Sequence, residues 1–178
     1  TQKIGSDPIS KTLTINNATL DLSSPGASLS MTGGNYTRYK VTVTNGGVLR
    51  VGEYTYDGAG LGSMAVNTGY WTLNNGRLEI TKESDGTFGN GLTVAAGGGA
   101  VEVVNAGSTM SITADDTHNI QLNGALTITG AGNMITGSDN AFRGTGRLIK
   151  DGSGTLTLAN SSSFTGGVEL KGGTLIVS

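Results

Sequence analysis

Residues 71–80 read WTLNNGRLEI, two short runs of alternating apolar and polar residues on either side of an Asn-Gly turn. Successive side chains of a β-strand point to opposite faces. Trp71 and Leu73 therefore share the inner face of the first run, and Glu79 points outward from the second. The segment predicts two β-strands that meet at a turn rich in Asn and Gly.

The same unit recurs along the chain. Its other copies are LTINNATLDL (13–22), VTVTNGGVLRV (41–51), LTVAAGGGAVEV (92–103), IQLNGALTI (120–128), LIKDGSGTLTL (148–158) and VELKGGTLIV (168–177). Their turn centres recur about every 26 residues, a period typical of solenoid repeats. Because each copy has one apolar face, we expect neighbouring copies to bury that face together.

Two folds contain strands joined by Asn-Gly turns. An antiparallel sandwich of hairpins explains each unit, but it does not explain why the whole unit recurs in the same order. A parallel β-helix does, since each coil needs the next to cover its core and its open backbone edges. We therefore predict an all-β parallel β-helix of about seven coils. Corner asparagines would stack as an amide ladder, at Asn17, Asn45, Asn75 and Asn123.

Composition excludes several other classes of protein. Of the 178 residues 31 are Gly, only 2 are Pro and none is Cys, and charged residues make up 13% with a net charge of -2. This balance disfavours nucleic acid as a partner, and the lack of Cys excludes a disulfide framework. The glycines are expected at the corners of the coils, where left-handed backbone angles are needed.

The C-terminal part carries a more specific pattern, LIKDGSGTLTLANSSSFTGGVELKGGTLIV (148–177). It resembles the passenger-associated repeat of type V autotransporters, in which Lys-x-Gly-x-Gly-Thr-Leu-x-Leu precedes a polar stretch with an aromatic residue, Thr-Gly-Gly and Gly-Gly-Thr-Leu-x-Val. The matching residues are Lys150, Gly152, Gly154, Thr155, Leu156, Leu158, Phe164, Thr165, Gly166, Gly167, Gly172, Gly173, Thr174, Leu175 and Val177. We assign residues 148–178 to this repeat, within a single β-helix segment that covers residues 1–178.

The resemblance implies a right-handed parallel β-helix displayed on, or released from, the surface of a Gram-negative bacterium. The route would lead through the periplasm and the outer membrane, where a C-terminal barrel of the parent chain would anchor it. Such a passenger segment would mediate adhesion or cell aggregation, or serve as a rigid stalk and folding aid. Its partners would be protein or glycan molecules on host or bacterial cells, including copies of itself on neighbouring cells.

One pair of carboxylates supports an enzymatic alternative. Glu79 and Glu102 would project from adjacent coils about 5 Å apart, near the separation of acid and nucleophile in retaining glycosidases. The same stripe contains Asp21 and Arg50, so a solvated charge ladder explains the pattern equally well. We favour a non-enzymatic rod, with a polysaccharide-acting lyase or glycosidase as the alternative.

Other chemical motifs are weak or missing from the sequence. His118 is the only histidine, and with Asp115 and Asp116 beside it we interpret this stretch as a solvated corner loop. No nucleotide-binding loop, Gly-x-Ser-x-Gly elbow or calcium nonapeptide is present. The sequence therefore predicts no catalytic residue, no metal and no cofactor.

Aromatic residues are concentrated in one part of the chain. All five tyrosines and Trp71 lie between residues 36 and 71, where the strand pattern lapses in the stretch GEYTYDGAGLGSMAVNTGY (52–70). Tyrosine is a preferred contact residue at binding surfaces. Candidate binding residues are Tyr36, Tyr39, Tyr54 and Tyr56, whereas Trp71 is expected in the core.

Overall fold

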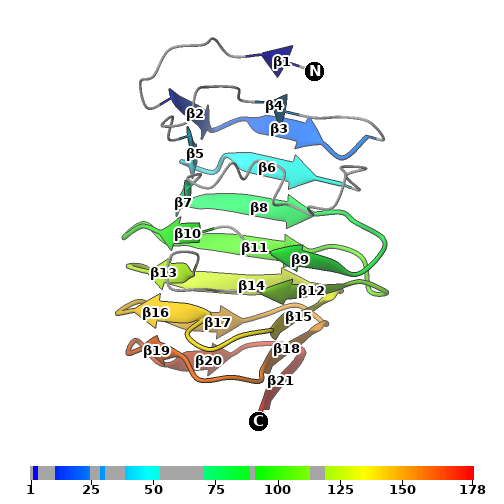
Figure 1. Ribbon diagram of the computed structural model, residues 1–178, viewed down its shortest axis with the longest axis vertical. Coiled ribbons are helices and arrows are strands. Elements are labelled where there is room, and N and C mark those ends of the chain that lie inside the picture. The colour runs from blue at the N-terminus through cyan, green and yellow to red at the C-terminus, as the bar shows by residue number, and fades with distance from the viewer. Residues whose placement is uncertain are drawn as a thin grey trace.

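The computed structural model describes residues 2–3, 11–24, 29–30, 39–52, 70–88, 91–112 and 119–178. Every regular element in these ranges is a β-strand. No helix in this part of the chain could span a membrane. The strands stack in successive coils along the long axis of the molecule, with the N-terminus at one end and the C-terminus at the other (Figure 1).

Three parallel sheets form the sides of the coils. The first sheet contains β2 (Lys11–Asn16), β5 (Tyr39–Thr44), β7 (Tyr70–Asn74), β10 (Gly91–Val94), β13 (Ile120–Leu122), β16 (Phe142–Gly144) and β19 (Ser163–Phe164). The second contains β3 (Thr19–Leu22), β6 (Val48–Val51), β8 (Gly76–Ile80), β11 (Gly99–Val103), β14 (Leu126–Gly130), β17 (Leu148–Lys150) and β20 (Val168–Leu170). The third contains β9 (Gly86–Phe88), β12 (Thr109–Ile112), β15 (Asn133–Thr136), β18 (Thr155–Leu158) and β21 (Thr174–Val177). A separate parallel pair joins β1 (Gln2–Lys3) to β4 (Leu29–Ser30).

The parallel pairing confirms the predicted β-helix and excludes the sandwich of hairpins. Equivalent residues of successive units are direct partners, as in Leu49, Leu78 and Val101 of the second sheet. Within the described residues five coils have all three sides, slightly fewer than the seven expected, because the two N-terminal coils contribute strands to the first and second sheets only.

The core lies between the three sheets and contains the predicted inward residues of the first two sheets together with residues of the third, such as Met110 and Met134. It is a continuous cluster in which Val41, Trp71 and Leu92 stack in the first sheet and Val51, Ile80 and Val103 stack in the second. Trp71 is buried, as expected. Stacking of aliphatic side chains in register gives each coil an apolar surface that only the next coil covers.

Asparagine takes the left-handed conformation at the first corners. Asn17, Asn45 and Asn75 have φ of 47°, 51° and 58°, angles that Asn tolerates better than most residues. The amide nitrogen of Asn45 donates to the side-chain oxygen of Asn16 at 3.0 Å. Asn45 therefore contacts Asn16, which lies one residue before Asn17, its partner in the predicted ladder.

Candidate functional site

The outward face of the second sheet carries a row of charged side chains, which we call the charge ladder. Its members are Asp21 on β3, Arg50 on β6, Arg77 and Glu79 on β8, and Glu102 on β11. Parallel register places Asp21, Arg50, Glu79 and Glu102 directly opposite one another on successive strands. Arg77 lies on the same face because it precedes Glu79 by two residues.

Opposite charges alternate along the charge ladder. The guanidinium of Arg50 contacts Asp21 at 2.8 Å and Glu79 at 2.6 Å. Arg77 contacts the other oxygen of Glu79 at 2.8 Å and reaches Glu102 at 3.3 Å. The four contacts join four successive strands of the second sheet. They compensate for the desolvation of Glu79, whose side chain is only 8% exposed although it points outward.

Asp21 ends the charge ladder at its N-terminal side. Its carboxylate accepts hydrogen bonds from the hydroxyl of Ser23 at 2.6 Å and from the Ser23 backbone at 2.9 Å. These bonds, followed by the one from Arg50, lower the pKa of Asp21 from 3.8 to about 2. The hydrogen bonds of Arg50 to Asp21 and Glu79 raise the pKa of Arg50, so the pair of Asp21 and Arg50 stays ionised at physiological pH.

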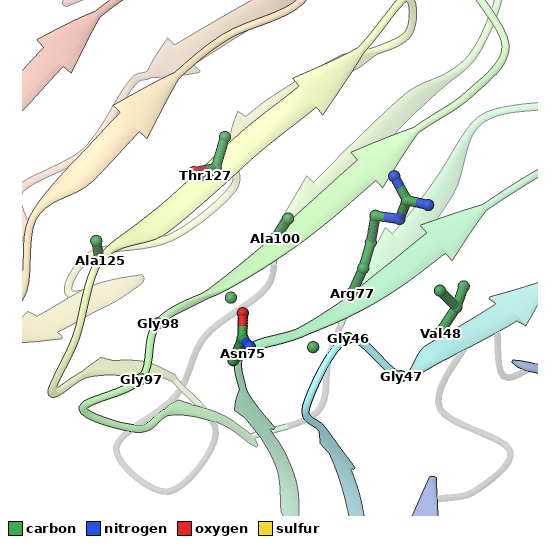
Figure 2. Close-up of a pocket in the computed structure, with 12 residues that line it drawn as sticks. Gly46, Gly47, Val48, Asn75, Arg77, Gly97, Gly98, Ala100, Ala125 and Thr127 are labelled. Carbon is green, nitrogen blue, oxygen red and sulfur yellow. The ribbon is translucent and has the colours of Figure 1, made fainter. Parts of the chain in front are cut away.

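A shallow groove of about 470 Å³ lies beside the charge ladder, at the corner between the first and second sheets. It is lined by Gly46, Gly47, Val48, Asn75, Gly76, Arg77, Gly97, Gly98, Gly99, Ala100, Ala125 and Thr127. Figure 2 shows Arg77 projecting from its strand, with the small side chains of Ala100 and Thr127 on the following strands. Ala100 contributes to the groove because the neighbouring strands carry the larger Arg77 and Thr127 at this outward position.

The geometry of the carboxylates favours the charge ladder over a catalytic pair. Glu79 and Glu102 are direct partners on neighbouring strands, as the sequence predicts. Both oxygens of Glu79 contact guanidinium groups, however, and Arg77 bridges the two carboxylates. Both oxygens of Glu79 are therefore engaged in ion pairs, as a charge ladder predicts.

Arg77 is the residue that the sequence analysis missed. The sequence feature that could have identified it is its position two residues before Glu79, which places both side chains on the same face of the strand. Its contact with Glu102 depends on the register between coils, which alternation within one strand does not reveal.

Most of the candidate binding residues cannot be placed. Tyr36, Tyr54 and Tyr56 lie outside the described residues, as do His118 and its two aspartates. Tyr39 is the first residue of β5. Among the described residues, no group of three or more His, Cys, Asp or Glu side chains could hold a metal ion.

Comparisons with known proteins agree with the coil architecture. Residues 148–177, which form β17 to β21, match the passenger-associated-transport-repeat family. Over 138 residues, 76% of the chain, the sequence is 33% identical to the adhesin BmaC autotransporter of Brucella suis biovar 1 (strain 1330). The matched part is 3% of that adhesin. No solved structure matches the chain.

Three observations agree on the class of protein. They are the C-terminal repeat, the similarity to an autotransporter adhesin and the stacked parallel coils. The stacked coils are those of a solenoid, and the matched repeat and the matched adhesin both belong to autotransporter passengers. Together they support the identification of this chain as a segment of a type V autotransporter passenger.

Proposed function

We propose that the chain is a rigid, non-enzymatic stalk segment of a surface-displayed passenger, which holds adhesive parts of that passenger away from the outer membrane. The observation that supports this function is the unbroken register of seven parallel strands in each of two sheets. At about 4.8 Å per coil, seven coils extend roughly 34 Å. The similarity to an autotransporter adhesin supports an adhesive role for the passenger as a whole.

The pairing of equivalent residues on adjacent coils defines a deletion that tests the proposed stalk function. Gly76 is the partner of Gly99, so removal of residues 76–98 takes out one coil and connects Asn75 to Gly99. Arg50 then faces Glu102, and Leu49 faces Val101. This shortened chain should be displayed normally on bacteria that carry the passenger, because every inward residue keeps an inward partner.

Adhesion and aggregation of these bacteria should be unchanged, since one coil contributes only about 4.8 Å of length. The matched control removes residues 76–99, one residue more, and connects Asn75 to Ala100. The corner between the first and second sheets then has one residue fewer between its paired strands than any described corner of this kind, so the following side chains turn to the opposite face. This control should lose surface display. Normal display combined with loss of adhesion after removal of residues 76–98 would show that the coil is a contact surface and would contradict the stalk.

A further inference from the structure

A lysine occupies a core position near the C-terminal end. Lys150 is the last residue of β17, and its strand partners are Ile128 on one side and Leu170 on the other. The equivalent inward residues of the earlier coils are all aliphatic, namely Leu20, Leu49, Leu78, Val101 and Ile128. Lys150 is 1% exposed. A buried ammonium requires compensating acceptors.

Backbone carbonyl groups supply these acceptors. The Lys150 ammonium donates to the carbonyl oxygens of Asp151 and Gly152, the latter at 3.1 Å, in the corner that follows its own strand. It also reaches the carbonyl oxygen of Gly172 at 3.4 Å, in the corner of the next coil. Burial lowers the pKa of Lys150, and the nearby Asp151 carboxylate opposes this effect.

The corner of the next coil has room for the ammonium because it is built from glycine. A Cβ atom on Gly173 would lie 2.8 Å from the Lys150 nitrogen. Gly152 and Gly173 both have φ of 71°, so each of the two corners contains a glycine in the left-handed conformation. Glycine at position 173 serves the turn and also makes space for the lysine.

An earlier corner between the second and third sheets is joined by different chemistry. There the side-chain amide of Asn105 donates to the carbonyl oxygens of Thr81 at 2.6 Å and Lys82 at 3.2 Å, across one coil boundary. In both places a side-chain donor reaches a corner carbonyl of an adjacent coil. At the C-terminal corner, however, the donor comes from inside the core.

We propose that Lys150 is a coil clamp, which couples the coil containing β17 and β18 to the following coil containing β20 and β21. These last strands are short, since β17 and β20 have three residues each, and they provide few ladder hydrogen bonds. Loss of the ammonium leaves up to three carbonyl oxygens without a donor. With the clamp in place, residues 148–177 open and close as one unit. This inference does not depend on whether the passenger is a stalk or an adhesive surface.

Amide hydrogen exchange of the chain tests the coil clamp. Lys150→Met keeps the length and the apolar stem of the side chain but removes the donor. Exchange in β20 and β21 should become about tenfold faster, because these strands lose their connection to the preceding corner. The control, Lys171→Met, changes a lysine whose side chain is 52% exposed and contacts Glu169 at 3.8 Å. It should leave exchange in these strands unchanged.

Two results would overturn the coil clamp. One is unchanged exchange of β20 and β21 in Lys150→Met, and the other is an acceleration spread evenly over all strands of the second sheet. Native-state acetylation of amines in the unchanged chain provides a test that requires no variant to fold. Relative to an exposed lysine, acetylation of Lys150 should be slowed by at least the factor by which the amides of β20 and β21 are protected from exchange, because its ammonium is released only when these strands open. Faster acetylation of Lys150 would also overturn the proposal.

Discussion

Individual glycines account for the closeness of the coils. At the corner between the first and second sheets, a Cβ atom on Gly124 would lie 2.1 Å from the carbonyl oxygen of Ala95. A Cβ on Gly146 would lie 2.1 Å from the carbonyl oxygen of Gly124, and one on Gly166 would lie 2.2 Å from that of Gly146. In this stack the carbonyl of one coil fills the space that a side chain of the next would need. Much of the glycine content therefore reflects contact between backbones.

Gly146→Ala should destabilise the chain by about 1–3 kcal/mol, the usual cost of forcing an extra carbon into a packed interior. Gly107→Ala is the control, because its Cβ would meet nothing within 4 Å. The control should change the free energy of unfolding by less than about 1 kcal/mol. Denaturant titration of both variants measures the difference, and equal stability of the two would show that the backbone contact is easily relieved.

Asp21 gives the chain an acid-sensitive contact. Its pKa falls from 3.8 to about 2 on folding, so the folded state binds its proton more weakly than the unfolded state. The carboxylate therefore stabilises the fold above pH 4, and this contribution is lost as the pH falls toward 2. Asp21→Asn should show a flatter decline in stability between pH 4 and pH 2, measured by denaturant unfolding at several pH values. An identical decline in both proteins would mean that Asp21 is not responsible.

At the scale of elements, the charge ladder joins β3, β6, β8 and β11 across their outward faces. Its central carboxylate differs from an ordinary surface group because Glu79 is nearly buried and contacts two arginines. The arginines themselves are partly exposed, with side-chain exposures of 36% and 46%. Solvent therefore screens part of the attraction.

Glu79→Gln should cost about 1–2 kcal/mol, because it leaves two neighbouring guanidinium groups without their shared carboxylate. Glu169→Gln is the matched control, since Glu169 contacts Arg147 at 3.2 Å but is 39% exposed. That change should cost less than about 1 kcal/mol. Thermal or denaturant unfolding of the two variants decides between a cooperative ladder and independent surface pairs. A similar, small loss in both would favour independent pairs.

Alternation within single strands predicted the inward residues of the clear repeats in the first two sheets, but not those of the third sheet, where Thr136 rather than Ile135 is buried. Leu78 and Ile80 are buried and partner equivalent residues, because period two depends only on the strand itself. The burial of Glu79 was not predictable in this way, since it results from arginines on two strands. Lys150 lies on the same face of its strand as Leu148, but its inward ammonium is stabilised by carbonyl groups of two corners, its own and that of the next coil, which alternation does not reveal.

At the scale of the whole molecule, each described strand of the three sheets pairs only with strands of the neighbouring coils. The sheet order follows the chain in steps of one coil from β2 to β19 and from β3 to β20. Stability is then close to a sum of coil terms and terms between neighbouring coils. The repeat period was therefore a strong predictor of architecture. The number of complete coils was less predictable, because strands of the third sheet carry a weaker alternating pattern.

The register between coils tolerates unequal lengths of chain. Hydrogen-bonded residues on adjacent coils are 29 positions apart between Arg50 and Glu79, 23 between Asn74 and Gly97, and 22 between Lys150 and Gly172. The additional residues fall outside the paired strands, so they do not alter which side chains face the core. Tandem duplication or loss of a DNA segment that encodes one coil would thus change the reach of the protein while preserving every existing contact except those at a single junction.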